Sequence, residues 1–260
     1  MHGSLLESKY WILAAAAFCA GALNAVAGGG SFFSFPALVA FGIPPVNANA
    51  TNTVALWPGQ LTAMAALRRE LHAVRDWFVV SMICAAIGGF CGARVLLFTN
   101  QGAFLRIVPW LLLFATVLFA ISGSVRGWLL RKKPAAKNAK PRLSPGLICG
   151  LLVVCFYIGY FGAGAGFLLF ALFALFGFTN FHELNVLKIL CNAVANGIAV
   201  ITFIAARAVH WRECLVMLLL AAAGGYCGAS YSRKLNPRIL RTVVIAAGLI
   251  VSAYFFWKTA

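Results

Sequence analysis

Long apolar runs are the feature of this chain that most restricts its fold. Leu, Ala, Phe and Val dominate the sequence, and several runs reach the ~20 residues that a helix needs to cross a bilayer. The chain is 63% hydrophobic and 10% charged, whereas a soluble domain is roughly 45–50% apolar and about 25% charged. The alternating strands of an outer-membrane barrel are not seen in the sequence. The sequence therefore predicts an all-α polytopic membrane protein.

The positive charge of the chain follows a membrane pattern. The net charge is +16, and seven of the 21 Lys and Arg residues lie in segment 126–142, which contains no acidic residue. Most of the others stand at the ends of apolar runs, as in proteins whose basic loops stay cytoplasmic. No RNA- or DNA-binding motif accompanies them. We therefore expect the lipid bilayer, and no nucleic acid, as a partner.

Motifs for metal binding and catalysis are missing from the sequence. The eight cysteines are scattered without a CxxC pair, and we interpret them as small buried hydrophobic residues. His182 and Glu183 do not form a zinc motif, because Val186 stands where HExxH needs its second histidine. No Ser/His/Asp set, P-loop or dinucleotide fingerprint is found. We expect no metal, no cofactor and no catalytic residue, and hence no enzyme.

The two halves of the chain resemble each other. GGFCGARVLLFTNQGAFLR (88–106) corresponds to GGYCGASYSRKLNPRILR (224–241), and AVAGGGSFFSFPALVAFG (25–42) corresponds to YFGAGAGFLLFALFALFG (160–177). Internal repeats are common in secondary transporters. The prediction is a first membrane repeat at 1–125, a basic cytoplasmic linker at 126–142 and a second membrane repeat at 143–260.

Each half contains a glycine-rich break, at 28–30 and at 162–166, followed by about ten apolar residues. Ten residues of helix rise only ~15 Å, half of a ~30 Å hydrocarbon core. If each break joins two half-helices into one crossing, each half has four crossings and the repeat is parallel. If the short pieces cross by themselves, each half has five crossings and the repeat is inverted. The basic residues fit both arrangements, and we favour two homologous repeats of about four transmembrane helices, each with a glycine-broken helix. The other spans are expected at about 49–67, 77–98, 104–123, 184–206, 213–231 and 239–257.

Polar side chains gather in the longer helix that follows each break and its short apolar piece, at about 49–67 and 184–206. They share one helix face in each half and correspond between the halves: Asn49, Asn52, Thr53 and Gln60 in the first, and Asn185, Lys188, Asn192 and Asn196 in the second. A charged side chain in the middle of a membrane costs ~2.5–3.5 kcal/mol or more, and such residues are usually functional. The alternatives are that Lys188 snorkels to the interface and that the asparagines join helices. Trp57-Pro58-Gly59 predicts a kink beside the first stripe, where the helix binds or bends.

We expect the two breaks to line a shared cavity, because irregular backbone survives in lipid only where protein or water satisfies its polar groups. Helix N-termini at the breaks would favour anions. The alternative is that the glycines only permit close helix packing, which we prefer for Gly88-Gly89 and Gly224-Gly225. The chain has five acidic residues, too few near this site for cation transport, so we expect a small anionic substrate. The predicted substrate-binding residues are Gly28, Gly29, Gly30, Ser31, Asn49, Thr51, Asn52, Gly164, Asn185, Lys188 and Asn192, and the candidates for proton coupling are His182 and Glu183.

GGGSFFSFPALVAFGIPP (28–45), followed by ANATNT and LWPG and by a degenerate second copy, resembles the TauE/SafE family of sulfite exporter-like permeases. The resemblance covers about 14–257, and the second copy departs most at Asn185-Val-Leu-Lys188. It implies a multi-pass permease of the inner membrane that moves a small anion such as sulfite, a sulfonate or another organic acid. We expect alternating access; the competing hypotheses are a passive anion channel and a non-transporting membrane scaffold. The sequence leaves the direction of transport, the coupling ion and a homo-oligomeric state open.

Overall fold

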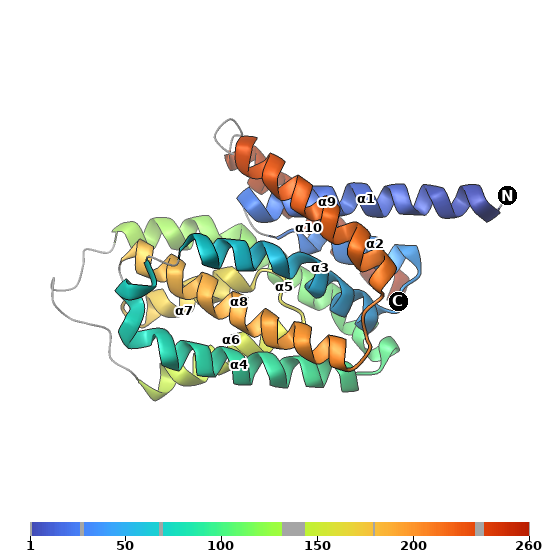
Figure 1. Cartoon of the computed structure of the whole chain (residues 1–260). Coiled ribbons are helices and arrows are strands. Elements are labelled where there is room, and N and C mark those ends of the chain that lie inside the picture. Colours follow the sequence, from blue (N-terminus) through green and yellow to red (C-terminus); the bar gives the residue numbers. More distant parts are fainter. Residues whose placement is uncertain are drawn as a thin grey trace.

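The computed structural model describes residues 2–26, 29–67, 70–131, 144–178, 180–231 and 237–259. Within them the chain forms ten α-helices, one short 3-10 helix and no strand (Figure 1). The all-α fold class is therefore confirmed. The elements are α1 (His2–Val26), α2 (Ser31–Phe41), α3 (Pro45–Ala66), η1 (Glu70–Val74), α4 (Arg75–Phe98), α5 (Gln101–Arg131), α6 (Pro145–Tyr160), α7 (Ala165–Leu175), α8 (Phe181–Ala205), α9 (Trp211–Tyr231) and α10 (Pro237–Thr259).

Four of the described helices are long and apolar enough to cross a membrane: α4, α5, α8 and α10. Shorter apolar stretches occur in α1, α2, α6 and α7. α3 has 22 residues, but its asparagines and threonines make it too polar to count among the helices that could cross a membrane. These findings support a membrane protein, and the number of crossings stays a prediction.

The short pieces predicted after the breaks are present, and α5 runs past its predicted span. The short apolar pieces after the breaks are separate helices, α2 and α7, of 11 residues each. α5 continues to Arg131, beyond the predicted span at about 104–123, and no proline lies between 123 and Pro134 to end it earlier. The predicted linker at 126–142 therefore begins inside α5, and its remainder from 132 onward lies outside the described residues.

Helices of the first half pair with helices of the second. α1 packs along α9, and α4 packs along α6; Figure 1 shows α1, in blue, beside α9, in orange-red. A methyl group on Gly224 would lie 2.0 Å from the carbonyl oxygen of Phe18, and one on Gly228 would lie 2.5 Å from that of Ala22. Both contacts advance by four residues, so α1 and α9 run parallel with their backbones touching.

The α4 glycines make the same kind of contact. A methyl group on Gly92 would lie 2.0 Å from the carbonyl oxygen of Phe156 in α6, and one on Gly89 would lie 2.5 Å from a carbonyl oxygen of α8. The prediction that Gly88-Gly89 and Gly224 serve close helix packing is thus confirmed. Gly225 differs, because a methyl group there would be 3.7 Å from the nearest atom.

α3 and α8 pack against each other and carry five of the nine buried polar side chains of the described residues. Asn47, near the start of α3, donates from Nδ2 to the carbonyl oxygen of Ala208, just beyond the end of α8, at 3.0 Å. At the opposite end, His182 of α8 lies beside Glu70, just beyond the end of α3. The two helices are therefore antiparallel.

An aromatic cluster holds α2 beside the second break. The ring of Phe35 in α2 lies 6.4 Å from Phe104 of α5, 5.7 Å from Phe161 and 6.0 Å from Phe255 of α10, measured between centroids. Phe161 directly follows α6. The core thus brings the first short helix close to the break in the second half.

Candidate functional site

The first break, between α1 and α2, is held by glycine backbone and by Asn24. Gly29 has φ +87°, in the left-handed region that favours glycine. Gly30 has no room for a side chain, because a methyl group would lie 2.3 Å from a carbonyl oxygen of α1. The Gly30 N–H donates to Asn24 Oδ1 at 2.8 Å. α2 then begins at Ser31, as predicted, while Gly28 lies outside the described residues.

Asn52 of α3 is hydrogen-bonded to the start of α2. Its Nδ2 donates to Ser31 Oγ at 3.3 Å, and its Oδ1 accepts from Ser34 Oγ at 2.5 Å. Asn52 is 3% exposed and Ser34 is fully buried. The structure therefore brings Ser31 and Asn52 together, with both polar groups of the amide engaged by α2.

Asn49 and Thr51, predicted as further ligands, connect α3 to the second half. Asn49 Nδ2 donates at 3.1 Å to the carbonyl oxygen of Tyr160, which ends α6 at the second break. Thr51 Oγ1 accepts the backbone N–H of His210, just before α9, at 3.0 Å. Thr51 precedes Asn52 by one residue and so lies ~100° away around the helix. The structure thus places Asn49 at a break and Thr51 at the α8–α9 connection.

The second break, between α6 and α7, contains two glycines in the left-handed region. Gly162 has φ +76° and Gly164 has φ +72°, and α7 begins directly after Gly164. The hydroxyl of Tyr157 donates to the carbonyl oxygen of Ala163 at 2.7 Å. A methyl group on Gly162 would lie 3.8 Å from Asn196 Oδ1. The polar stripe of α8 therefore reaches this break, as the stripe of α3 reaches the first.

Lys188 lies against the first turn of α7. A methyl group on Gly166 would be 3.7 Å from its Cδ, and the lysine is partly buried. The sequence predicted that Lys188 and the second break belong to one site, and the structure brings them together. Asn185 stands one turn before Lys188 and Asn192 one turn after it, and both are partly buried.

Asn196 extends the polar stripe toward α3. Its Nδ2 lies 3.1 Å from Gln60 Oε1, 2.9 Å from the Asn192 carbonyl oxygen and 3.5 Å from Asn192 Oδ1. Gln60 and Asn196 were assigned to the stripes but not to the predicted ligands. Ser34 and Asn24 were missed. The spacing of Ser34, three residues after Ser31, could have placed it on the same face of α2.

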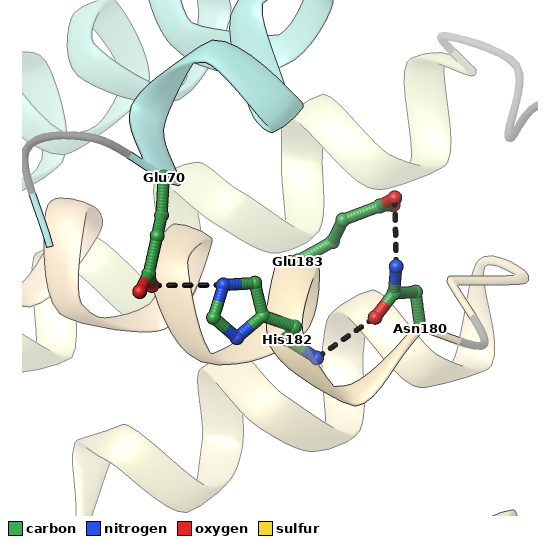
Figure 2. Close-up of polar contacts among 4 residues, drawn as sticks. All are labelled: Glu70, Asn180, His182 and Glu183. Atoms are coloured by element: carbon green, nitrogen blue, oxygen red, sulfur yellow. Dashed lines mark hydrogen bonds and ion pairs between the residues drawn. The ribbon is translucent and has the colours of Figure 1, made fainter.

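His182 and Glu183 lie at the start of α8, away from the break (Figure 2). His182 Nε2 is 2.9 Å from Glu70 Oε2, in an ion pair whose histidine side chain is 56% exposed. Asn180 caps the helix, because its Oδ1 accepts the His182 N–H at 3.0 Å and its Nδ2 donates to Glu183 Oε1 at 3.1 Å. Six residues separate His182 from Lys188, a rise of ~9 Å along the axis.

The comparisons with known proteins identify the family. The family model described as "Sulfite exporter TauE/SafE" matches residues 13–255. The chain belongs to the TauE/SafE family. A Haemophilus influenzae protein named "Probable membrane transporter protein" is 28% identical over 247 residues, which are 93% of this chain and 92% of that protein. The "Probable membrane transporter protein YfcA" of Escherichia coli K12 is also 28% identical over 247 residues, 94% of this chain and 88% of its own.

A third relative, "Probable membrane transporter protein ORF9" of a Sinorhizobium species, is 26% identical over 239 residues, 91% of this chain and 88% of its own. No solved structure matches the chain. The resemblance to the TauE/SafE family is confirmed, and the match spans both glycine breaks. The breaks and the polar helices beside them therefore belong to a probable membrane transporter.

Proposed function

We propose that this TauE/SafE protein is a multi-pass permease of the inner membrane that moves a small anion, such as sulfite, a sulfonate or another organic acid. The observation that carries the proposal is the contact between Lys188 and the first turn of α7 at Gly166. A lysine ammonium and a helix N-terminus both favour negative charge. The description of the family model, which names a sulfite exporter, supports the same substrate class.

The positions of the acidic residues also support an anionic substrate. Four of the five acids lie in the first turn of a helix: Glu70, Asp76, Glu183 and Glu213. At these places they stabilise helix starts. A permease for cations would need carboxylates at its breaks, where the described side chains are amides, hydroxyls and Lys188.

Two homologous repeats, 1–125 and 143–260, are part of the proposal. The packing between the halves is reciprocal: α1 contacts α9 and α6 contacts α4, while α2 contacts α10 and α7 contacts α5. Two related units placed around an approximate two-fold axis make such exchanged contacts. Paired units with broken helices at their interface are a common transporter design.

In the proposed mechanism the two units rock about a central site, which opens to each side in turn. Lys188 attracts the anion, and the α7 N-terminus adds its dipole. Asn185 and Asn192 flank the lysine, and the first break contributes neutral donors. The proposed binding residues are Gly28, Gly29, Gly30, Ser31, Asn49, Asn52, Gly164, Asn185, Lys188 and Asn192. Thr51, whose oxygen accepts the His210 N–H, is proposed with them, as is Asn52 with its hydrogen bonds to Ser31 and Ser34.

The test is uptake of labelled sulfite and small sulfonates into proteoliposomes by wild type and Lys188→Met. We expect saturable uptake that falls about tenfold or more in the variant, because a hydrogen bond to a charged group contributes ~1.5–3 kcal/mol. Lys258→Met is the matched control, since Lys258 is an exposed lysine at the end of α10. Equal uptake by wild type and Lys188→Met would show that Lys188 only snorkels.

The same assay separates the competing classes. A passive anion channel would give flux that rises without saturation at millimolar substrate. A non-transporting scaffold would give neither flux nor binding in protein shown to be folded and inserted. Either result would replace the permease proposal.

A further inference from the structure

The Trp57-Pro58-Gly59 motif of α3 meets α8 at Gly197. A methyl group on Gly197 would lie 2.9 Å from Trp57 Cζ2 and 3.3 Å from its Cε2 and Nε1. The indole N–H donates to the carbonyl oxygen of Ala193, one turn earlier in α8, at 3.0 Å. The edge of the tryptophan thus occupies a slot that exists because position 197 carries no side chain.

α3 and α8 are both easier to bend near the Trp57–Gly197 contact than elsewhere along their length. Pro58 has no N–H, so the carbonyl of Val54 lacks the usual bond from four residues on. Gly59 follows in open space, with no atom within 4 Å of an added methyl group. In α8, Gly197 itself gives the backbone extra freedom. Each of the two helices therefore has an easily bent position beside the tight contact between Trp57 and Gly197.

Away from the Trp57–Gly197 contact, polar contacts join α3 and α8 at both ends of the pair. At one end, Asn47 donates to the carbonyl oxygen of Ala208 and Thr51 accepts the N–H of His210, each at 3.0 Å. At the other end, the exposed pair of His182 and Glu70 joins α8 to η1. Polar contacts of this kind can exchange their partners for water, whereas a filled slot resists separation.

We propose that the Trp57–Gly197 contact is the pivot about which α3 and α8 rock, so that one end of the pair closes as the other opens. The inference rests on the proposed transport function for its purpose, since rocking would expose the polar stripes to each side in turn. The movement itself is a property of the protein alone. It can be measured without substrate, so its failure and a failure of transport are separate results.

Amide hydrogen exchange in lipid nanodiscs tests the pivot on wild type and Gly197→Ala. The peptides of interest cover one end (45–52 and 206–212) and the other (62–67 and 182–188). An added methyl group at Gly197 pushes against the indole and biases the rocking equilibrium. We expect exchange rates to change by about threefold or more, upward at one end and downward at the other. A general loss of stability would instead raise exchange at both ends.

Two further variants complete the test. Gly197→Ala combined with Trp57→Phe shortens the indole edge and should return both ends toward wild type. Gly225→Ala in α9 is the control, because Gly225 lies outside the α3–α8 pair and its methyl group would be 3.7 Å from the nearest atom, and both ends should stay as in wild type. Exchange that rises at both ends in Gly197→Ala, or that Trp57→Phe does not reverse, would overturn the pivot. If Gly197→Ala does not fold, the single variant Trp57→Phe is measured instead. Unchanged exchange at both ends of the pair in that variant would refute the proposal.

Discussion

Asn52 is the residue that joins α3 to the first glycine break. Its amide bridges the hydroxyls of Ser31 and Ser34, and one of these, Ser34, is fully buried. Lys188 plays a different part at the second break, where it brings charge to the start of α7. The two breaks are therefore unequal: the first is neutral and closed by hydrogen bonds, and the second carries the positive charge.

Asn52→Ala should destabilise the protein. The substitution removes one of the two acceptors of the buried Ser34 hydroxyl, which keeps the Gly30 carbonyl oxygen at 3.2 Å, so the expected loss is that of one hydrogen bond, ~0.5–1.5 kcal/mol. The measurement is thermal unfolding of purified protein in detergent. Thr62→Ala is the control on the same helix, because Thr62 is exposed and its hydroxyl donates to the Gly59 carbonyl oxygen at 2.9 Å, within its own helix. Equal unfolding temperatures for the two variants would contradict this role of Asn52.

At the residue scale, sequence spacing predicts which polar side chains share one helix face better than it predicts their hydrogen-bond partners. The spacing of Asn185, Lys188 and Asn192 placed Lys188 on one polar face, and the structure brings that lysine to the break. The bond from Asn49 to the Tyr160 carbonyl spans 111 residues, and the bond to Thr51 from His210 spans 159. Which side chain meets which carbonyl depends on how the two halves pack, and no local pattern contains that information.

At the scale of elements, the glycine breaks were predictable because they act locally. Gly29, Gly162 and Gly164 adopt positive φ, which a helix does not allow, so the helices end there whatever packs around them. The end of α5 has no such signal: the candidate span Gln101–Ile121 agrees with the predicted 104–123, and the helix continues beyond it to Arg131. The short helices α2 and α7 were expected from the sequence, and whether each forms one broken crossing with α1 or α6 or crosses by itself stays a prediction.

Gly92→Ala should separate α4 from α6. The methyl group would lie 2.0 Å from the Phe156 carbonyl oxygen, and relieving such overpacking costs typically ~1–3 kcal/mol. We expect a lower unfolding temperature and a lower yield of monodisperse protein. Gly225→Ala in α9 is the contrasting variant, because its methyl group would have 3.7 Å of space and alanine favours a helix by ~1 kcal/mol over glycine. Similar losses in both variants would exclude the close backbone contact as the cause.

At the scale of the whole molecule, the ion pair of His182 and Glu70 joins the second half to the first at one end of α8. Because both side chains are partly exposed, the pair contributes little to stability, ~0–1 kcal/mol. An imidazole gains a positive charge when it binds a proton, so a proton bound by His182 would alter a contact between the halves. This is the basis on which we propose His182, with Glu183 beside it, for proton coupling.

His182→Gln should therefore uncouple transport from a pH gradient. In proteoliposomes, uptake by wild type should increase with a gradient of one sign, and the variant should keep the uptake seen without a gradient and lose the increase. Glu70→Gln should weaken the gradient effect while leaving thermal unfolding within about 1 kcal/mol of wild type. A gradient effect that survives in His182→Gln would place the coupling at another group.

The parallel contact between α1 and α9 also governs how the protein is made. α1 ends at Val26 and α9 begins at Trp211, so a ribosome that adds ~5–20 residues per second needs roughly 10–40 s to supply the partner of the first helix. Throughout that time the small-residue face of α1, with Gly21, has only lipid or a chaperone to cover it. The first half therefore enters the membrane as an unfinished unit, and cellular quality control can recognise the uncovered face of α1 until α9 arrives.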